Sequence, residues 1–288
     1  MDTLKNTKSI LNKYNIRANK RFGQNFLIDD NILSDIVEVS DIKENDLVIE
    51  IGPGLGNLTH YLLQKAKYVL LIEIDKKMIE ILNDRFKGYY NYTLLNADIL
   101  RTNLDEVIDN IEKVEKIKFG NVKVVANLPY YITTPIIFKL LQEENRINDI
   151  VVMVQKEVAQ RMVAKNKSKD FGILTLMVEY LSNAKIQFVV PSSAFIPAPN
   201  VTSAIIKLKK EKKYFTNNEE ILFKLIHSSF SQRRKKLVNS LESTKFLNLD
   251  KLALENILDE LNISKTVRAE ELSLDDYIKI VEKLNNII

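Results

Sequence analysis

The sequence contains no cysteine and no tryptophan, and its only histidines are His60 and His227. Without cysteine the protein can form neither disulfide bonds nor thiolate metal sites, and two histidines are too few for a histidine-rich metal centre. We therefore expect no bound metal. Glycine and proline are also scarce, at seven and six residues, and 45% of the residues are hydrophobic. This composition indicates a folded globular protein rather than a disordered chain.

Long apolar runs are missing as well. The first twelve residues are polar and lysine-bearing, unlike a signal peptide, and no stretch approaches the roughly 20 apolar residues that a membrane-spanning helix needs. The sequence therefore predicts a soluble, cytoplasmic protein. The net charge is +4 and the isoelectric point is near 8.9, which permits a polyanionic partner without requiring one.

Apolar runs alternate with amphipathic segments from residue 47 onward. Strands are expected at 47–51, 68–74, 92–95, 122–126 and 150–155, with helices at 58–66, 78–86, 104–114 and 135–141. Such alternation predicts a parallel sheet with helices on both faces, that is, an α/β fold. Two further β-rich segments, 186–190 and 201–208, are expected to complete the sheet as a hairpin-like pair.

A lysine-rich run at 207–213 interrupts the apolar periodicity and marks a domain boundary. Beyond it the pattern predicts four helices, at 219–230, 233–241, 252–261 and 274–284. Near the N-terminus a weak helical period covers 4–14, and Asp29 can cap a helix at 32–39. We therefore expect two domains, an α/β domain over residues 1–210 and a small all-helical domain over residues 211–288.

The motif Asn127-Leu128-Pro129-Tyr130 follows the expected strand at 122–126. In open α/β sheets, ligands bind outside the carboxyl ends of the strands. The motif resembles that of methyltransferases acting on the exocyclic amine of adenine, whose lone pair is delocalised into the ring. The Asn127 amide oxygen and the Leu128 carbonyl, held by the fixed φ of Pro129, can accept the two amine hydrogens and free that lone pair. The Tyr130 ring can stack on the base, which contributes roughly 1–3 kcal/mol. The alternative is a strand that ends in a proline turn with surface tyrosines.

The segment Gly52-Pro53-Gly54-Leu55-Gly56 lies between the first expected strand and its helix. The glycines, Gly52 and Gly54 among them, let backbone amides approach a ligand closely beside a helix N-terminus. Dinucleotide folds use Gly-x-Gly-x-x-Gly, whereas here Asn57 stands at the place of the third glycine. Glu50, just before the loop, fits a pyrophosphate poorly and suits an ammonium or a sulfonium.

Two more carboxylates follow the next two expected strands. Glu73 is placed to accept hydrogen bonds from ribose hydroxyls, and Asp98 to accept one from an adenine amine; either could instead be a loop or capping residue. With the glycines, they point to S-adenosylmethionine as the cofactor.

Several motifs in order closely resemble the KsgA/RsmA family of small-subunit rRNA adenine-N6 dimethyltransferases. They are Gln24–Leu27, Glu50–Gly56, Glu73, Asp98, Asn127–Tyr130, Phe195–Ser203 and Phe230–Leu237. The resemblance implies a Rossmann-like class I S-adenosylmethionine-dependent methyltransferase domain and a small helical C-terminal domain. It implies dimethylation of two adjacent adenosines in a hairpin loop near the 3′ end of 16S rRNA, within the 30S subunit or its precursor. It also implies that Asn25, Leu27, Gly52, Glu73, Asp98 and Asn127 contact the cofactor.

In this interpretation Phe195 is the second stacking face for the target base, opposite Tyr130, in a loop stiffened by Pro197 and Pro199. The alternative is that Phe195 fills core space at the edge of the sheet. A target adenine must leave its stack to enter such a pocket, which is easier for loop nucleotides.

Two basic clusters are candidate RNA contacts. Arg17, Lys20 and Arg21 could contact phosphate near the mouth of the active site, although such clusters are more often a solvated face. Arg233, Arg234, Lys235 and Lys236 are expected to face RNA phosphate, but four consecutive cations cannot share one helical face, so some of them are merely solvated. We expect a monomer.

Three other functions compete. An erythromycin-resistance type methyltransferase of 23S rRNA shares the fold and much of the central motif. The glycine loop, Thr134-Pro135-Ile136 and Gln232-Arg233-Arg234-Lys235 favour the small-subunit enzyme. A non-catalytic ribosome-assembly or nucleic-acid-binding protein is disfavoured by the intact loop, both carboxylates and Asn127. A small-molecule methyltransferase would leave the basic second domain without a purpose.

Overall fold

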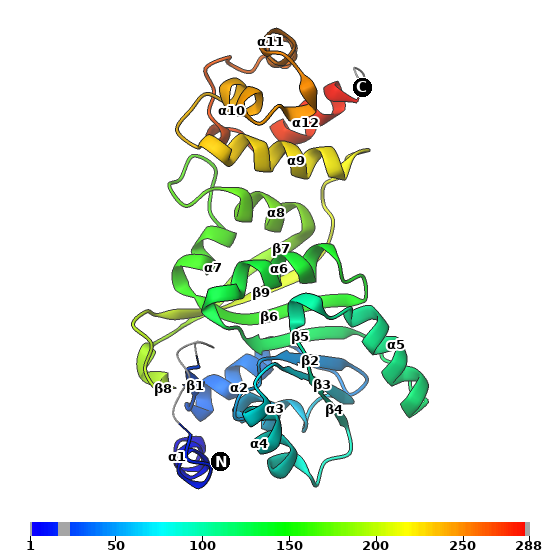
Figure 1. The fold of residues 1–288 in the computed structure, drawn as a ribbon, viewed down its shortest axis with the longest axis vertical. Helices are drawn as coiled ribbons and strands as arrows, with labels where there is room; N and C mark the ends of the chain where they lie inside the picture. Colours follow the sequence, from blue (N-terminus) through cyan, green and yellow to red (C-terminus); the bar gives the residue numbers. More distant parts are fainter. Residues whose placement is uncertain (1, 17–23, 286–288) are drawn as a thin grey trace. The chain divides into compact units, whose positions relative to one another are not determined.

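The structure, a computed structural model, describes residues 2–16 and 24–285 and divides into two compact units (Figure 1). The first comprises residues 1–159 and 184–210, and the second comprises residues 160–183 and 211–288. The chain thus changes unit at Lys210, within the lysine-rich run. Residues 160–183 differ from the expectation, because they group with the helices and not with the α/β unit.

A seven-stranded sheet with the order β4-β3-β2-β5-β6-β9-β7 forms the centre of the first unit. Its strands are β2 (Leu47–Ile51), β3 (Tyr68–Glu73), β4 (Tyr92–Asn96), β5 (Val122–Asn127), β6 (Ile147–Gln155), β7 (Ser182–Val190) and β9 (Ser203–Lys210). Strands β2 to β6 are parallel, and β9 runs antiparallel to β6. β2 pairs with β3 on one side and β5 on the other, so the chain order reverses there, the usual place for a ligand crevice.

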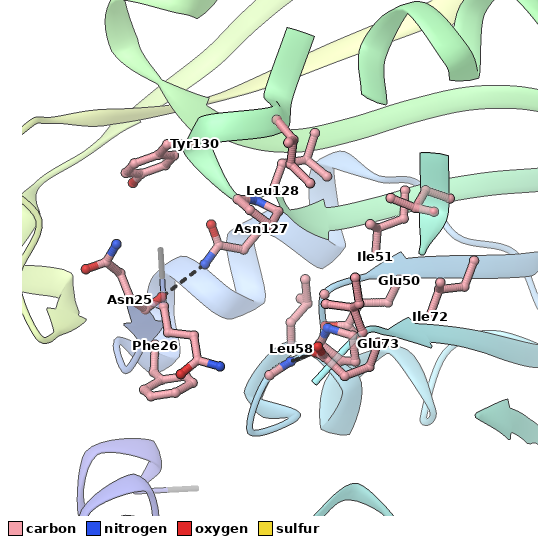
Figure 2. A pocket seen from close by; sticks show the side chains of 18 of the residues that line it. Asn25, Phe26, Glu50, Ile51, Leu58, Ile72, Glu73, Asn127, Leu128 and Tyr130 are labelled. Atoms are coloured by element: carbon pink, nitrogen blue, oxygen red, sulfur yellow. Dashed lines mark hydrogen bonds between the residues drawn. The ribbon is translucent and has the colours of Figure 1, made fainter. Parts of the chain in front are cut away.

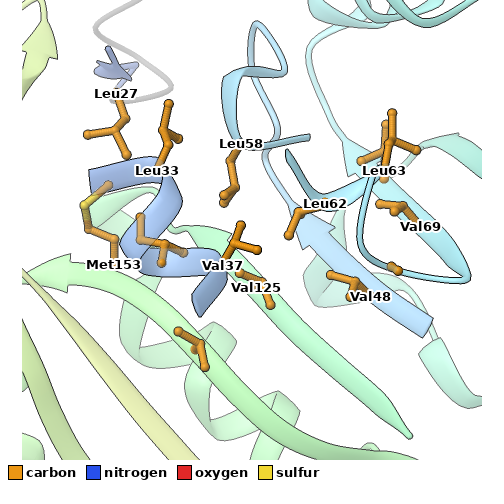
Figure 3. Close-up of a cluster of buried hydrophobic side chains, with 14 of the residues drawn as sticks. Leu27, Leu33, Val37, Val48, Leu58, Leu62, Leu63, Val69, Val125 and Met153 are labelled. Atoms are coloured by element: carbon orange, nitrogen blue, oxygen red, sulfur yellow. The ribbon is translucent and has the colours of Figure 1, made fainter. Parts of the chain in front are cut away.

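Four helices connect the parallel strands, as the alternating pattern predicted: α3 (Asn57–Leu62), α4 (Lys76–Phe86), α5 (Leu104–Glu115) and α6 (Thr133–Gln142). Helices α1 (Thr3–Lys13) and α2 (Asp30–Val39) precede β2, and α7 (Lys156–Met162), which the sequence pattern did not predict, follows β6. The Asp29 side chain caps α2 by accepting from the amides of Asn31 and Ile32. Figure 3 shows α2 and α3 packing on the sheet through Leu33 and Leu62, both fully buried. This core anchors the start of α3, next to the glycine loop.

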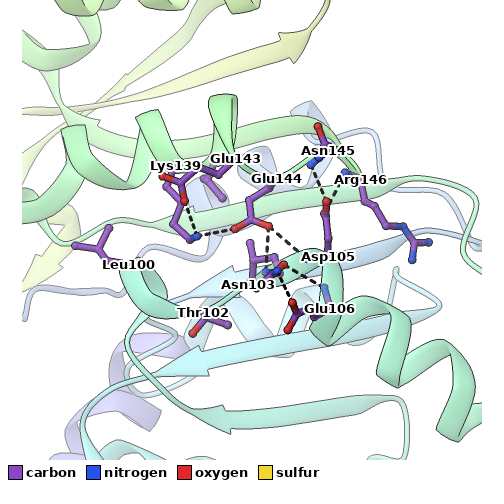
Figure 4. Close-up of polar contacts among 12 residues, drawn as sticks. Leu100, Thr102, Asn103, Asp105, Glu106, Lys139, Glu143, Glu144, Asn145 and Arg146 are labelled. Carbon is purple, nitrogen blue, oxygen red and sulfur yellow. Dashed lines mark hydrogen bonds and ion pairs between the residues drawn. The ribbon is translucent and has the colours of Figure 1, made fainter. Parts of the chain in front are cut away.

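A buried ionic cluster fixes the segment between β4 and α5 (Figure 4). The Glu144 carboxylate accepts from the backbone amides of Leu104, at 3.0 Å, and Asp105, at 3.3 Å. Lys139 lies 2.7 Å from the same carboxylate, which is 2% exposed. Because the first amides of a helix have no partner within it, the carboxylate satisfies them and the lysine balances its charge. The chain leaving Asp98 is thereby held against α6.

The second unit is helical and contains α8 (Ile173–Leu181), α9 (Glu219–Ser229), α10 (Leu237–Ser243), α11 (Lys251–Glu260) and α12 (Leu274–Leu284). The sequence pattern missed α8 because nearly all its residues are apolar and buried, which leaves no amphipathic period. The predicted helix at 233–241 is wrong at its start. Residues 233–235 form a turn and a bend, Lys236 makes an isolated β-bridge with Arg268, and α10 begins at Leu237.

Within the described ranges, no helix is long and apolar enough to cross a membrane. The same residues contain no group of three or more His, Asp or Glu side chains arranged to hold a metal ion.

Candidate active site

A pocket opens at the carboxyl ends of β2, β3 and β5, where the strand order reverses (Figure 2). Its walls come from the strand ends and from the segments that follow β4 and precede α2. The lining residues are Gln24 to Leu27, Glu50 to Leu55, Asn57, Leu58, Ile72 to Ile74, Ala97 to Leu100, and Asn127 to Ile132. Every residue expected to contact the cofactor lines this pocket: Asn25, Leu27, Gly52, Gly54, Glu73, Asp98 and Asn127.

The Asn127 side chain is oriented by one hydrogen bond. Its Nδ2 donates to the backbone oxygen of Asn25 at 3.2 Å, and Figure 2 shows the amide reaching from the end of β5 toward that residue. Among the residues described, no hydrogen bond is made to Asn127 Oδ1 or to the Leu128 carbonyl oxygen. The bond to Asn25 therefore makes the oxygen the acceptor that Asn127 can offer to a ligand.

Tyr130 is held in place by a residue of the segment 195–203. Its hydroxyl lies 2.5 Å from the Ser203 hydroxyl, and Ser203 is fully buried at the start of β9. Burial raises the pKa of Tyr130, so its hydroxyl stays protonated at neutral pH. Pro129 packs beside Gly52, where a Cβ would lie 3.8 Å from the proline ring. The motif after β5 and the glycine loop after β2 are thus in contact.

Phe195 is packed in the hydrophobic core of the first unit. Its side chain is 3% exposed, does not line the pocket and belongs to the hydrophobic core. The short strand β8 (Phe195–Ile196) pairs antiparallel with β1 (Phe26–Leu27), which places Phe195 opposite Leu27. Residues paired directly across two antiparallel strands lie on the same face, so Phe195 and Leu27 enter the same core cluster. This packing fits the core alternative. Leu27, in the same cluster, also lines the pocket, and the stacking role of Phe195 stays a prediction.

Glu73 and Asp98 both face the pocket and both also bind backbone amides. Glu73 accepts from the amides of Gly54, at 3.2 Å, and Asp75, at 2.9 Å, and burial raises its pKa. Each of its oxygens keeps a further lone pair for a ligand hydroxyl. Asp98 accepts from the amide of Leu100 at 3.0 Å, so it is both a capping residue and a pocket residue.

Glu50 is the most deeply buried carboxyl group of the pocket, at 2% exposed. Burial raises its pKa to about 8; the hydrogen bond from Thr59 opposes this shift, and the nearby charge of Glu73 adds to it. The Thr59 hydroxyl donates to Glu50 at 2.5 Å. At neutral pH the carboxyl group is therefore largely protonated, and a cationic ligand nearby would favour its ionisation.

Asn57 joins four parts of the chain around the glycine loop. Its Nδ2 donates to Thr7 Oγ1, at 2.9 Å, and to the Leu27 carbonyl, at 2.8 Å, while its Oδ1 accepts from Arg85 at 3.0 Å. Helix α1, strand β1 and helix α4 are thereby tied to the first turn of α3. The sequence marked Asn57 only as a departure from the dinucleotide pattern, because its partners lie up to 50 residues away.

Other pocket residues were missed because they look like ordinary surface positions. Ile74 and Leu100 are apolar yet 48% and 37% exposed, and they flank Glu73 and Asp98 along the pocket wall. Tyr131 also lines the pocket and is 57% exposed. In the sequence, the signal that could have found them is an apolar residue close to a polar one at the end of an expected strand. In the structure, their exposure marks them as candidate ligand contacts.

The predicted RNA contacts fall into two groups. Arg17, Lys20 and Arg21 lie outside the described residues. Arg233, Arg234, Lys235 and Lys236 lie in the helical unit, and all four are exposed. Arg233 differs from the others, because its guanidinium forms an ion pair with Glu270 at 2.6 Å.

Comparison with known proteins extends over almost the whole chain. The family model described as ribosomal RNA adenine dimethylase matches residues 15–286. The ribosomal RNA small subunit methyltransferase A of Clostridium botulinum (strain Okra / Type B1) is 43% identical over 285 residues, covering 98% of this chain and all of that protein. A crystal structure of a dimethyladenosine transferase from Plasmodium falciparum is 30% identical, with a TM-score of 0.74, covering 91% of this chain and 98% of that chain.

The 23S rRNA methyltransferase ErmE is a more distant neighbour, at 23% identity and a TM-score of 0.65, covering 91% of this chain and all of that one. It shares the fold. Fold, pocket and relatives together define the class of protein: a class I S-adenosylmethionine-dependent methyltransferase with a Rossmann-like domain and a helical C-terminal part. The chain belongs to the ribosomal RNA adenine dimethylase family, and it is an rRNA adenine-N6 methyltransferase.

We predict that Glu50 makes the stability of the cofactor-free protein depend on pH. Its pKa is about 8 in the folded chain and about 4.5 in the unfolded chain. Between these values the folded state keeps a proton that the unfolded state releases, so rising pH lowers the free energy of unfolding, by up to about 1.4 kcal/mol per pH unit. Urea unfolding of wild type and Glu50→Gln at pH 5.5 and pH 8 measures the effect. The variant should lose less stability at pH 8, and parallel losses would refute the assignment.

Proposed function

We propose that this protein transfers methyl groups from S-adenosylmethionine to N6 of two adjacent adenosines in the 3′-terminal hairpin loop of 16S rRNA, dimethylating each. Its substrate is the 30S subunit or a late precursor of it, and it acts as a monomer in the cytoplasm, where subunits are assembled. The observation that carries the chemical part is the orientation of Asn127, whose Nδ2 is engaged by Asn25 and whose Oδ1 is left to accept. Sequence relatives named as small-subunit enzymes support the choice of rRNA.

The pocket fits the cofactor in shape and in chemistry. Glu73 accepts the ribose hydroxyls at the end of β3, and Asp98 accepts from the adenine amine. Ile74 and Leu100 form apolar walls for the adenine ring. Asn25, Leu27, Gly52 and Gly54 supply close backbone approach on the other side. S-adenosylmethionine itself supplies a methyl group on a positively charged sulfur, and the nearby Glu50 carboxyl favours that charge.

The residues after β5 prepare the attacking amine. In the first transfer to each adenosine, Asn127 Oδ1 and the Leu128 carbonyl would accept the two N6 hydrogens and so draw the nitrogen lone pair out of conjugation; in the second transfer one of them would accept the single hydrogen that remains. Pro129 fixes the direction of the Leu128 carbonyl. Tyr130, anchored through Ser203, supports the extruded base by stacking. No strongly basic side chain is needed, because methyl transfer from a sulfonium releases a neutral thioether, a good leaving group, and the methylated amine then loses its proton to water.

Mass spectrometry of 16S rRNA fragments tests this function. Purified protein is incubated with S-adenosylmethionine and unmethylated 30S particles, and in parallel with protein-free 23S RNA. Two dimethylated adenosines in one 3′-terminal fragment of 16S rRNA are expected. Labelling of the 23S RNA alone would favour an erythromycin-resistance type enzyme. No detectable cofactor binding by calorimetry would favour a non-catalytic assembly protein.

A further inference from the structure

In the helical unit, Arg233 connects two segments that are far apart in sequence. Its Nε donates to the Glu270 carboxylate at 2.6 Å, and its Nη2 donates to the backbone oxygen of Lys169 at 2.7 Å. Lys169 belongs to the loop of residues 163–171 between α7 and α8, here called the basic loop; Figure 1 shows this loop approaching the end of α9. Two of the three nitrogens of this guanidinium, Nε and Nη2, are therefore engaged within the protein.

Further bonds hold the basic loop to the same place. The Lys167 amide donates to the Glu270 carbonyl at 3.2 Å, and Asn166 Nδ2 donates to the Glu271 carbonyl at 3.3 Å. Lys167 adopts φ +65°, a left-handed conformation that a residue with a side chain keeps only when its surroundings hold it there. The basic loop is thus docked in a defined conformation beside the run Arg233–Lys236.

The docking gathers cations that the sequence shows as two unrelated groups. The basic loop contributes Lys165, Lys167 and Lys169, and the run contributes Arg234, Lys235 and Lys236. All six are exposed, and no ion pair is found for any of them within the part of the chain that the structure describes. The acidic neighbour Glu270 is neutralised by Arg233. Asp170 of the loop and the adjacent Glu271 offset only part of this charge, so the result is a patch with an excess of positive charge within a single compact unit.

We propose that the basic loop and residues 234–236 form one surface that binds the phosphate backbone of the RNA, and that Arg233 is the positioning residue that holds the two halves together. This rests on the proposed function, which makes RNA the partner. Phosphate contacts of this kind orient a protein on RNA without reading its sequence. Lys165, Lys167 and Lys169 are thereby assigned to RNA binding, and Arg233 is removed from the direct phosphate contacts.

Salt-dependent binding of the full-length protein to unmethylated 30S particles tests the surface. The logarithm of the affinity decreases linearly with the logarithm of the salt concentration. For three contacts to single-stranded phosphate, this decrease should be less steep by about 2 in the triple variant Lys165→Ala, Lys167→Ala, Lys169→Ala. When the salt concentration rises from 50 to 200 mM, the factor by which the affinity of this variant decreases should be about 20 times smaller than the factor for wild type. The matched control is Lys251→Ala, Lys265→Ala, Lys279→Ala, which removes three exposed lysines on or next to α11 and α12. Equal slopes for the loop triple and wild type would overturn the proposal.

The role of Arg233 is tested by combining variants. If it acts through the basic loop, Arg233→Ala should weaken binding in the wild-type background and have no further effect in the loop triple variant. Arg233→Lys should behave like Arg233→Ala, because an ammonium group cannot reproduce the paired contact of Nε and Nη2 to Glu270 and Lys169. Full rescue by lysine, or an additional slope loss of about 0.7 in the triple background, would make Arg233 a direct phosphate contact instead.

Two controls separate this inference from the function on which it rests. Cofactor affinity measured by calorimetry should be unchanged in every variant, because the cofactor pocket lies in the other compact unit. If wild-type protein itself bound the particles without salt dependence and methylated no 16S rRNA, the proposed function would fail. If wild type methylated 16S rRNA and the loop triple bound as wild type does, only the inference would fail.

Discussion

Replacing Asn127 with alanine is expected to reduce turnover about 10²–10³-fold at saturating substrates while leaving RNA affinity nearly unchanged. The size follows from losing an acceptor that acts mainly in the transition state. The side chain accepts from the amine only as the lone pair localises, so its removal leaves the binding surfaces for RNA intact. Single-turnover methylation of 30S particles gives the rate, and sedimentation with the same particles gives the affinity.

Asn127→Asp is the informative companion variant. Aspartate keeps an acceptor of the same size but loses the N–H that donates to the Asn25 carbonyl at 3.2 Å. Its carboxylate is repelled by that carbonyl, so the variant should also be slow, although the acceptor remains. If aspartate restored full turnover, the bond to Asn25 would not be what orients the group. Equal losses of turnover and RNA affinity in the alanine variant would remove Asn127 from the chemical step.

Replacing Gly56 with alanine should destabilise the protein by about 2–5 kcal/mol. Gly56 has φ +78°, and an added Cβ would lie 2.5 Å from the ring of Phe86 and 2.9 Å from Leu82, both fully buried on α4. The left-handed backbone accounts for about 1–2 kcal/mol of the loss and overpacking for about 1–3 kcal/mol. Equilibrium urea unfolding, followed by circular dichroism, measures the change.

Gly52→Ala is the matched control for that prediction. It has the same backbone requirement, with φ +66°, but its Cβ would approach nothing closer than the Pro129 ring at 3.8 Å. It should lose only the backbone part, about 1–2 kcal/mol. Equal losses for the two variants would show that the close approach of α3 to α4 is not what requires glycine at position 56.

The pocket was largely predictable because its polar residues follow buried strands directly. Glu73, Asp98 and Asn127 each come just after an apolar run, and parallel strands bring their carboxyl ends to one edge. The alternation of strands and helices likewise predicted the sheet. These are local signals, which can be read within about ten residues of each position.

The features that were not predicted depend on distant partners or on patterns without a period. For Phe195 the sequence left a core and a pocket position open, because an aromatic residue in an apolar motif fits either, and only its pairing with β1 shows the core packing. Helix α8 lacks an amphipathic stripe. The partners of Arg233 lie 37 and 64 residues away, so sequence alone could not distinguish it from Arg234. The roles of the site residues stay predictions.

Helix α1 bears on how the protein should be prepared for experiment. Ile10, Leu11 and Tyr14 pack against a small cluster of Phe26, Leu55, Met78 and Ile81, two members of which also line the pocket. The Thr3 amide donates to Asp30 at 3.2 Å, and Thr7 receives the hydrogen bond of Asn57. Removing the first fourteen residues would expose to solvent the outer side of Phe26 and Leu55, which line the pocket. A bulky affinity tag ahead of Thr3 would clash with the surroundings of Asp30, to which the Thr3 amide donates. Purification handles therefore belong at the opposite terminus.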